Sequence, residues 1–167
     1  MTQTATTSPA QVETKKVTGR RTLHFATLAD CLADAEMLAR SRVRCLGNWS
    51  AGQIFQHVAT GMNSSIDGAR FKPSLLFRLI LPLFKKRILT KGMTPGFKLP
   101  PAAARVLVPG DTDTEAGLAA IRSAIARLQT EENRAPSPFL GKLTREESDQ
   151  LHLRHAELHF SFIVPTD

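Results

Sequence analysis

The sequence contains only two cysteines, one tryptophan and no tyrosine. Cys31 and Cys45 lack the CxxC spacing of zinc knuckles and are too few for a disulfide framework, so we expect reduced thiols and a cytoplasmic protein. The scarcity of large aromatic side chains argues against the stacking platforms that bind single-stranded nucleic acids. Although the net charge is +7, we therefore expect a solvated basic surface and no nucleic-acid partner.

Several functional motifs are also absent. The chain has no glycine-rich phosphate loop, no G-x-S-x-G and no recognisable Ser-His-Asp arrangement, which argues against phosphoryl transfer and serine-hydrolase chemistry. The N-terminal region shows no apolar segment typical of a secretory signal. Residues 1–20 are rich in Thr, Ser and Gln, and we expect a flexible tail there. Residues 21–167 are predicted to form a single domain, because 42% hydrophobic residues suffice for one core.

Four helix starts are indicated by capping boxes, in which a Ser or Thr precedes an acidic residue or Gln by three positions. Each box precedes a stretch whose apolar residues recur at helical spacing, and period-2 alternation is limited to residues 105–108. The sequence therefore predicts an all-α fold, a four-helix bundle. The expected helices span about 27–41, 50–66, 113–131 and 144–163, and their boxes are Thr27 with Asp30, Ser50 with Gln53, Thr112 with Glu115 and Thr144 with Glu147.

A long segment, residues 67–111, separates the second and third expected helices. Six prolines interrupt it, so we expect a Pro-rich, partly helical insertion. Its first half, residues 73–91, is apolar and basic, but Arg78 and Pro82 interrupt it and it falls short of the ~20 apolar residues of a transmembrane helix. Two interpretations remain open. One is a short helical pair that covers the mouth of the bundle, and the other is an element that lies on a membrane surface or binds lipid.

Three of the five histidines lie within eight residues near the end of the chain. At 100° per residue, His152, His155 and His159 fall within about 60° of a helix, among apolar neighbours. Arg154 and Glu157 fall on the opposite side, which we expect to face outward. An unpaired imidazole among apolar side chains is costly. Each ring therefore needs either a metal ion or a hydrogen-bond partner.

The spacing of His155 and His159 is i, i+4, so their rings can reach one ion from adjacent turns. His57 lies on the second expected helix, at the edge of its apolar stripe, and two helices could then deliver three imidazoles to one point. Such a site suits Zn, Ni or Fe and leaves positions open for water or substrate. We predict His57, His155 and His159 as metal ligands. For His152 three roles remain open: a fourth metal ligand, a hydrogen-bond donor to one of the ligands, or a polar group of the pocket.

These motifs resemble the DinB-like superfamily over roughly residues 21–164. The matching stretches are Asn48-Trp49-Ser50, Gln53-Ile-Phe-Gln-His57 and His155-Ala-Glu-Leu-His159. That superfamily comprises metal-binding four-helix bundles and includes bacterial low-molecular-weight-thiol transferases, in which a helix-two histidine and a later HxxxH pair hold the metal. The resemblance implies a divalent transition metal at His57, His155 and His159. It also implies a small-molecule substrate, such as a low-molecular-weight thiol.

Further similarity points to a branch known only as a domain of unknown function; it lies in Gly47-Asn-Trp-Ser50, Ser65-Ile-Asp-Gly68 and residues 139–144. Two positions depart from that branch. Ser137 stands where a His before Pro is usual, and Ser148 stands where a Trp is usual. These departures bring a substrate contact or a packing anchor into question and leave the triad intact. Trp49, just before a helix cap, is predicted to pack on the following turn as a hydrophobic staple.

Two functions follow from these patterns. The first is a metal-dependent enzyme, such as a thiol transferase or hydrolase, whose ion activates a small thiol or water without an obvious general base. The second is a non-catalytic, metal-stabilised module that uses residues 73–91 to bind a lipid, a membrane surface or a protein partner. We favour a small-molecule partner over a membrane surface. A homodimer is compatible with a bundle of this kind.

Overall fold

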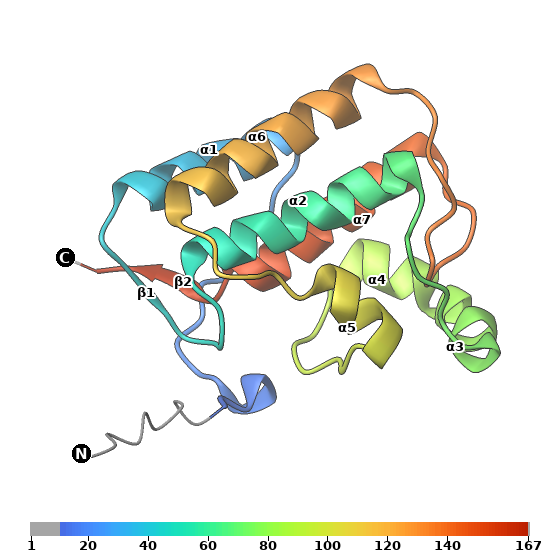
Figure 1. Ribbon diagram of the computed structural model, residues 1–167, viewed down its shortest axis with the longest axis horizontal. Coiled ribbons are helices and arrows are strands. Elements are labelled where there is room, and N and C mark those ends of the chain that lie inside the picture. Colours follow the sequence, from blue (N-terminus) through green and yellow to red (C-terminus); the bar gives the residue numbers. More distant parts are fainter. Residues whose placement is uncertain (1–10, 167) are drawn as a thin grey trace, which may run out of the picture.

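The computed structural model describes residues 11–166 and is predominantly helical, with one small sheet (Figure 1), as the all-α prediction requires. The two helices α6 and α7 each pack against both α1 and α2. The apolar stripes expected from the sequence line this contact, including Phe55 and Met62 of α2 and Ile121 and Ile125 of α6. The four helices span Leu28–Arg40 (α1), Ala51–Asp67 (α2), Thr114–Thr130 (α6) and Arg145–Phe160 (α7).

Capping boxes begin three of these helices, as predicted. Thr27, Ser50 and Thr144 each accept the backbone N–H three residues on, and the side chain at that position accepts the N–H of the cap in return. The predicted box at Thr112 is wrong. Asp113 caps α6 instead, and its Oδ1 accepts the N–H of Ala116 at 2.7 Å. A carboxylate also interacts favourably with the positive end of the helix dipole.

Two glycines bring α2 and α6 into close contact. A Cβ atom added to Gly117 would overlap the carbonyl oxygen of Gly52 and lie 2.9 Å from its Cα. A Cβ added to Gly52 would in turn overlap the backbone of Asp113. The absence of side chains at these positions therefore sets the distance between the two helices, one and a half turns before His57.

The connection between α1 and α2 pairs with the end of the chain. Val43–Cys45 (β1) and Ile163–Pro165 (β2) form an antiparallel pair in which Arg44 faces Val164. The helix predicted to reach residue 163 was therefore too long, because α7 ends at Phe160 and the chain turns into β2. The short sheet fixes the end of α7 next to the residues that lead into α2.

The side of α7 that was predicted to face outward is buried, so that prediction is wrong. Arg154 is 7% exposed, and its guanidinium donates to the carbonyl of Phe25 at 2.7 Å and lies 3.1 Å from the Glu157 carboxylate. The same carboxylate accepts the N–H of Phe25 at 2.6 Å. Residues before α1 thus cover this side of α7. Glu157 is bound there, on the side of α7 opposite to His155 and His159.

The segment between α2 and α6 contains three short helices and a 3-10 turn. Among them, α4 packs against α7 and α5 packs against α2. Within residues 11–166, no helix combines the length and the apolar character needed to cross a bilayer. The elements are Leu75–Ile80 (α3), Leu81–Phe84 (η2), Lys85–Lys91 (α4) and Pro101–Leu107 (α5).

The N-terminal residues from position 11 onward contact the rest of the fold. A flexible tail is predicted for residues 1–20, and the first ten of these lie outside the described residues. Beyond it, a 3-10 turn spans Thr14–Lys16 (η1). The Asn48 side chain hydrogen-bonds both backbone groups of Val12, and Arg20 donates to the hydroxyl of Ser161 at 2.9 Å.

Candidate metal centre

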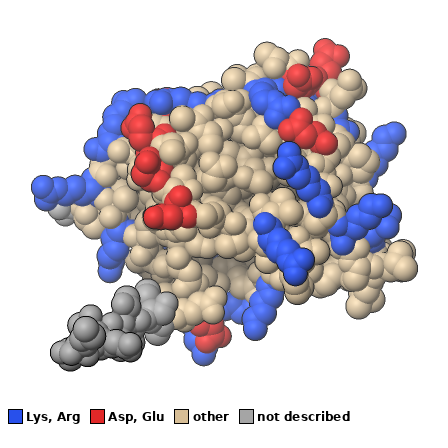
Figure 2. Space-filling model, viewed as in Figure 1, with Lys and Arg blue, Asp and Glu red and all other residues tan. Residues whose placement is uncertain are grey.

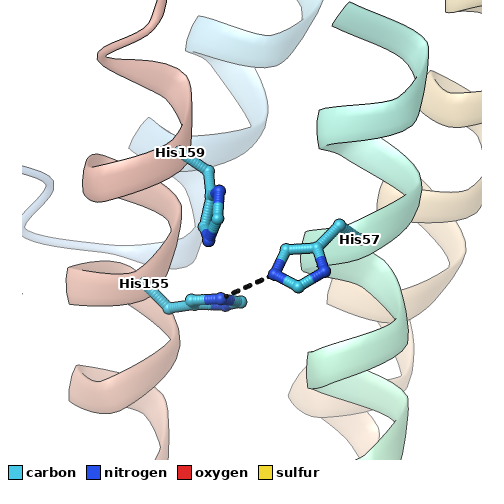
Figure 3. Close-up of side chains that lie close together, drawn as sticks. All are labelled: His57, His155 and His159. Carbon is cyan, nitrogen blue, oxygen red and sulfur yellow. Dashed lines mark hydrogen bonds between the residues drawn. The ribbon is translucent and has the colours of Figure 1, made fainter. Parts of the chain in front are cut away.

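The three predicted ligands lie side by side between α2 and α7. One ring nitrogen from each of His57, His155 and His159 lies within 4.8 Å of the other two. Figure 3 shows His155 and His159 projecting from successive turns of α7 toward His57 on α2. His57 and His155 are 98 positions apart in the sequence, and the fold brings them together. These three histidines could hold one metal ion.

A backbone carbonyl fixes the ring of His57. Its Nδ1 lies 2.6 Å from the carbonyl oxygen of Leu107, so Nδ1 carries the proton and donates it. Leu107 ends α5, where carbonyl groups lack partners within the helix. The Nε2 atom of His57 is consequently unprotonated and points toward the other two rings. Sequence reasoning missed Leu107, because a backbone acceptor leaves no signature in side-chain identity.

One pair of these nitrogens has a spacing close to that of a tetrahedral site. Nε2 of His57 lies 3.1 Å from Nε2 of His155. Two nitrogens held at about 2.1 Å from one tetrahedral ion are separated by about 3.4 Å. Gly61 of α2 lies against the His155 ring, and a Cβ atom at that position would be in ordinary van der Waals contact with it, 3.4 Å away.

The hydrogen bond within the group involves only two of its three rings. His155 can donate from Nε2 to Nε2 of His57, which accounts for the 3.1 Å contact. The ring of His159 has no hydrogen-bond partner among the residues that the structure describes. An ion bound to all three nitrogens would satisfy His159 as well. Three imidazoles with converging nitrogens are a donor set that fits a divalent transition metal.

The rings are also in the protonation state that binds metals. Burial lowers the pKa of His155 and His159 well below the usual 6.5, and the neighbouring histidines lower it further. Burial also lowers the pKa of His57, although the hydrogen bond to Leu107 opposes this effect. All three imidazoles are neutral at pH 7, as ligation requires.

Trp49 forms a wall of the site and also packs against the hydrophobic core, and its predicted role as a staple on the following turn stays a prediction. Its ring stacks on His159 with centroids 5.7 Å apart and planes 17° apart, and it lies 4.8 Å from the ring of His57. The residue precedes the Ser50 cap, and its ring lies against a histidine of a helix a hundred residues away. A local sequence pattern does not reveal such a contact.

His152 is separate from the triad and has its own partner. Its Nε2 lies 2.8 Å from the hydroxyl oxygen of Ser65, and that hydroxyl donates to the carbonyl of Met62 at 2.7 Å. The hydroxyl must therefore accept, and His152 donates. Of the three roles predicted for it, a buried polar group beside the site matches this geometry. Burial, assisted by Arg134, lowers the pKa of His152 to about 4.

The low pKa of His152 predicts acid sensitivity of the metal-free protein. Between pH 6.5 and about 4, the unfolded chain protonates this residue and the folded chain does not, so the free energy of unfolding falls as pH falls. His152→Gln keeps a donor for Ser65 and cannot titrate. We expect the urea midpoint of the variant to fall less between pH 7 and pH 5 than that of the wild type. His24→Gln, at an exposed histidine, serves as the control, and equal pH dependence in His152→Gln and the wild type would contradict this assignment.

The remaining candidate residues lie outside the triad. The hydroxyl of Ser137 accepts the N–H of Leu140 at 3.2 Å, within the turn closed by Ser137 and Gly141. Ser148 is buried in the first turn of α7. Within residues 11–166, the three-histidine group contains no carboxylate or thiol. Two surface depressions, of about 430 and 450 Å³, are lined by other residues and not by the triad.

Comparison with known proteins gives a family and no further relatives. Residues 17–166 match the model of a family described as a protein of unknown function (DUF1569). No curated protein and no solved structure matches the chain. The matched region contains all three histidines and extends over most of the sequence. The chain therefore belongs to the DUF1569 family.

Proposed function

We propose that this protein is a DinB-like four-helix bundle that binds one divalent transition metal through His57, His155 and His159. The observation that carries the proposal is the convergence of three neutral imidazoles, one of them already oriented by the Leu107 carbonyl. The mutual packing of α1, α2, α6 and α7 supports the bundle. The order of the ligands, first on α2 and then as an HxxxH pair on α7, supports the relation to the DinB-like superfamily.

We further propose that the protein is a metal-dependent enzyme. Three protein ligands leave a coordination position open, as in catalytic zinc sites. A bound ion would lower the pKa of a coordinated water or thiol and so supply a nucleophile at neutral pH. His155 and His159 are less completely buried than His57, which supports access of a small molecule from this side of the triad. Trp49 lies against His57 and His159 and limits access from its own side.

A non-catalytic role is the alternative, and the absence of a carboxylate from the triad group within residues 11–166 favours it. The described residues then provide no adjacent general base, and a bound ion would serve to hold α2 and α7 together. In that case the segment 73–91 would carry the binding function of the protein. The two proposals differ in one measurable property, which is whether small molecules bind at the ion.

A thiol titration of the Co²⁺-loaded protein distinguishes the two. We expect low-molecular-weight thiols of the glutathione, mycothiol or bacillithiol type to change the visible absorption of the Co²⁺ and the fluorescence of Trp49, the one tryptophan of the chain. The S-methylated form of each thiol is the matched control and should have no effect on the absorption. The enzyme proposal is wrong, and the metal is structural, if Co²⁺ stays bound and its spectrum changes neither with added thiol nor with deprotonation of a bound water as the pH is raised.

A further inference from the structure

Large apolar side chains are exposed along α3 and η2. Leu75 is 72% exposed, Leu79 70% and Leu83 80%. These residues share a contiguous stretch of ten residues with three further apolar side chains that are 43–65% exposed. We call this the apolar tip; it consists of Leu75, Leu76, Leu79, Ile80, Leu83 and Phe84. Patches of this kind on a folded protein mark sites of interaction.

The apolar tip is joined to the bundle through α4. α4, which follows it, is fixed to α7 by the buried Leu89 and by an ion pair of 2.7 Å between Lys85 and Glu147. Yet Leu75, Leu79 and Leu83 project away from the described residues. The tip is therefore attached to the fold through α4, while its leucines remain exposed to water. Exposed leucines of this kind are typical of a surface that binds a partner.

The charge of the surrounding segment indicates that the partner is negatively charged. Residues 68–110 contain nine Lys and Arg and no Asp or Glu, whereas the remaining residues contain 13 basic and 15 acidic side chains. The positive net charge of the protein thus resides in this segment. Figure 2 shows only Lys and Arg among the charged side chains over the region of α3, α4 and α5. Lys86 and Arg87 immediately follow the tip and are exposed.

We propose that the apolar tip docks onto an anionic lipid bilayer surface. Exposed leucines flanked by cations match the interfacial helices that insert apolar side chains between headgroups and place basic side chains at the phosphates. A second copy of the chain is a poor occupant, because two segments with nine cations each would repel. This inference is independent of the proposed metal function, because no triad histidine belongs to the tip.

Vesicle sedimentation with the full chain tests this proposal. We expect cosedimentation with vesicles of phosphatidylcholine containing about one third phosphatidylserine, weakening as salt is added, and little with phosphatidylcholine alone. The double variant Leu79→Ser, Leu83→Ser should lower the partition coefficient roughly tenfold or more. Lys86→Gln with Arg87→Gln should lower it roughly thirtyfold. Both pairs are exposed, and thermal melting verifies that the variants fold.

A matched variant controls for net charge. Arg42→Gln with Arg44→Gln removes the same number of charges from exposed positions just before and within β1, at the opposite end of the molecule from α3 (Figure 1). It should bind anionic vesicles nearly as well as the wild type. The proposal is overturned if the wild type binds neither vesicle, or if all three double variants bind equally. It is also overturned if the wild type is a dimer that Leu79→Ser, Leu83→Ser dissociates, since the tip would then join two copies.

Discussion

His57→Ala and His159→Ala are each expected to remove the metal from a protein that otherwise carries about one divalent ion per chain. Each variant leaves two imidazoles, and His57→Ala also removes the ring that Leu107 orients. Loss of a group that merely orients a ligand lowers metal affinity by about 10–100-fold. Loss of a ligand itself should lower it by more than about 100-fold. Elemental analysis after gel filtration measures the metal content of each variant.

His24→Ala is the matched control for this experiment. His24 is the histidine outside the site, with a side chain that is 77% exposed, and its replacement should leave the metal content unchanged. Circular dichroism of each variant separates loss of the ion from loss of the fold. A wild type that stays folded but binds none of Zn²⁺, Ni²⁺, Co²⁺ and Fe²⁺ would exclude the site. Retention of the ion by both alanine variants would place it elsewhere.

Gly117→Ala is expected to destabilise the protein by about 3 kcal/mol, at the upper end of the usual cost of overpacking. The new methyl group would overlap the carbonyl oxygen of Gly52, and neither backbone can move without separating α2 from α6. Alanine gains only about 1 kcal/mol over glycine from helix propensity, which is too little to compensate. For a chain of this size, the melting temperature should fall by roughly 6–12 °C.

Gly110→Ala provides the comparison, because a Cβ atom at that position meets nothing within 4 Å. It should change the melting temperature little. Since α2 carries His57, Gly117→Ala should also weaken metal binding, whereas Gly110→Ala should not. An unchanged or raised melting temperature in Gly117→Ala would show that α2 and α6 do not cross at these glycines.

The local signals in the sequence located the helices that carry the site. Capping boxes at Thr27, Ser50 and Thr144 depend on residues three positions apart, so they can be recognised without knowledge of the fold. The box at Thr112 failed because Asp113, one position later, is the better acceptor for the first turn of α6. Helical spacing also explains why His155 and His159 could be paired in advance.

Local patterns of this kind do not predict contacts between segments that are far apart in the sequence. β1 and β2 are three residues each and pair across more than a hundred residues, so neither shows a useful alternation. Arg154 and Glu157 were assigned to an outer face because helical periodicity assumes that the polar side meets water. The structure covers that side with the backbone of Phe25, which both residues bind. Trp49 was missed for a similar reason, because its partner His159 belongs to another helix.

Leu107 connects the metal centre with the segment that carries the apolar tip. Its carbonyl orients His57, yet it belongs to α5 in the basic segment that also carries the apolar tip. The segment between α2 and α6 therefore contributes both an acceptor for the metal centre and the surface proposed to meet a membrane. Residues 73–91 can be altered at exposed leucines without touching Leu107, which keeps the two proposals experimentally separate.

The most direct test of the metal centre is an anomalous difference map from crystals of metal-loaded protein, recorded at the absorption edge of the added ion. The account predicts one strong peak between α2 and α7, about 2.0–2.2 Å from a ring nitrogen of each of His57, His155 and His159. A peak at other residues, or no peak at the triad in crystals grown with excess metal, would contradict it.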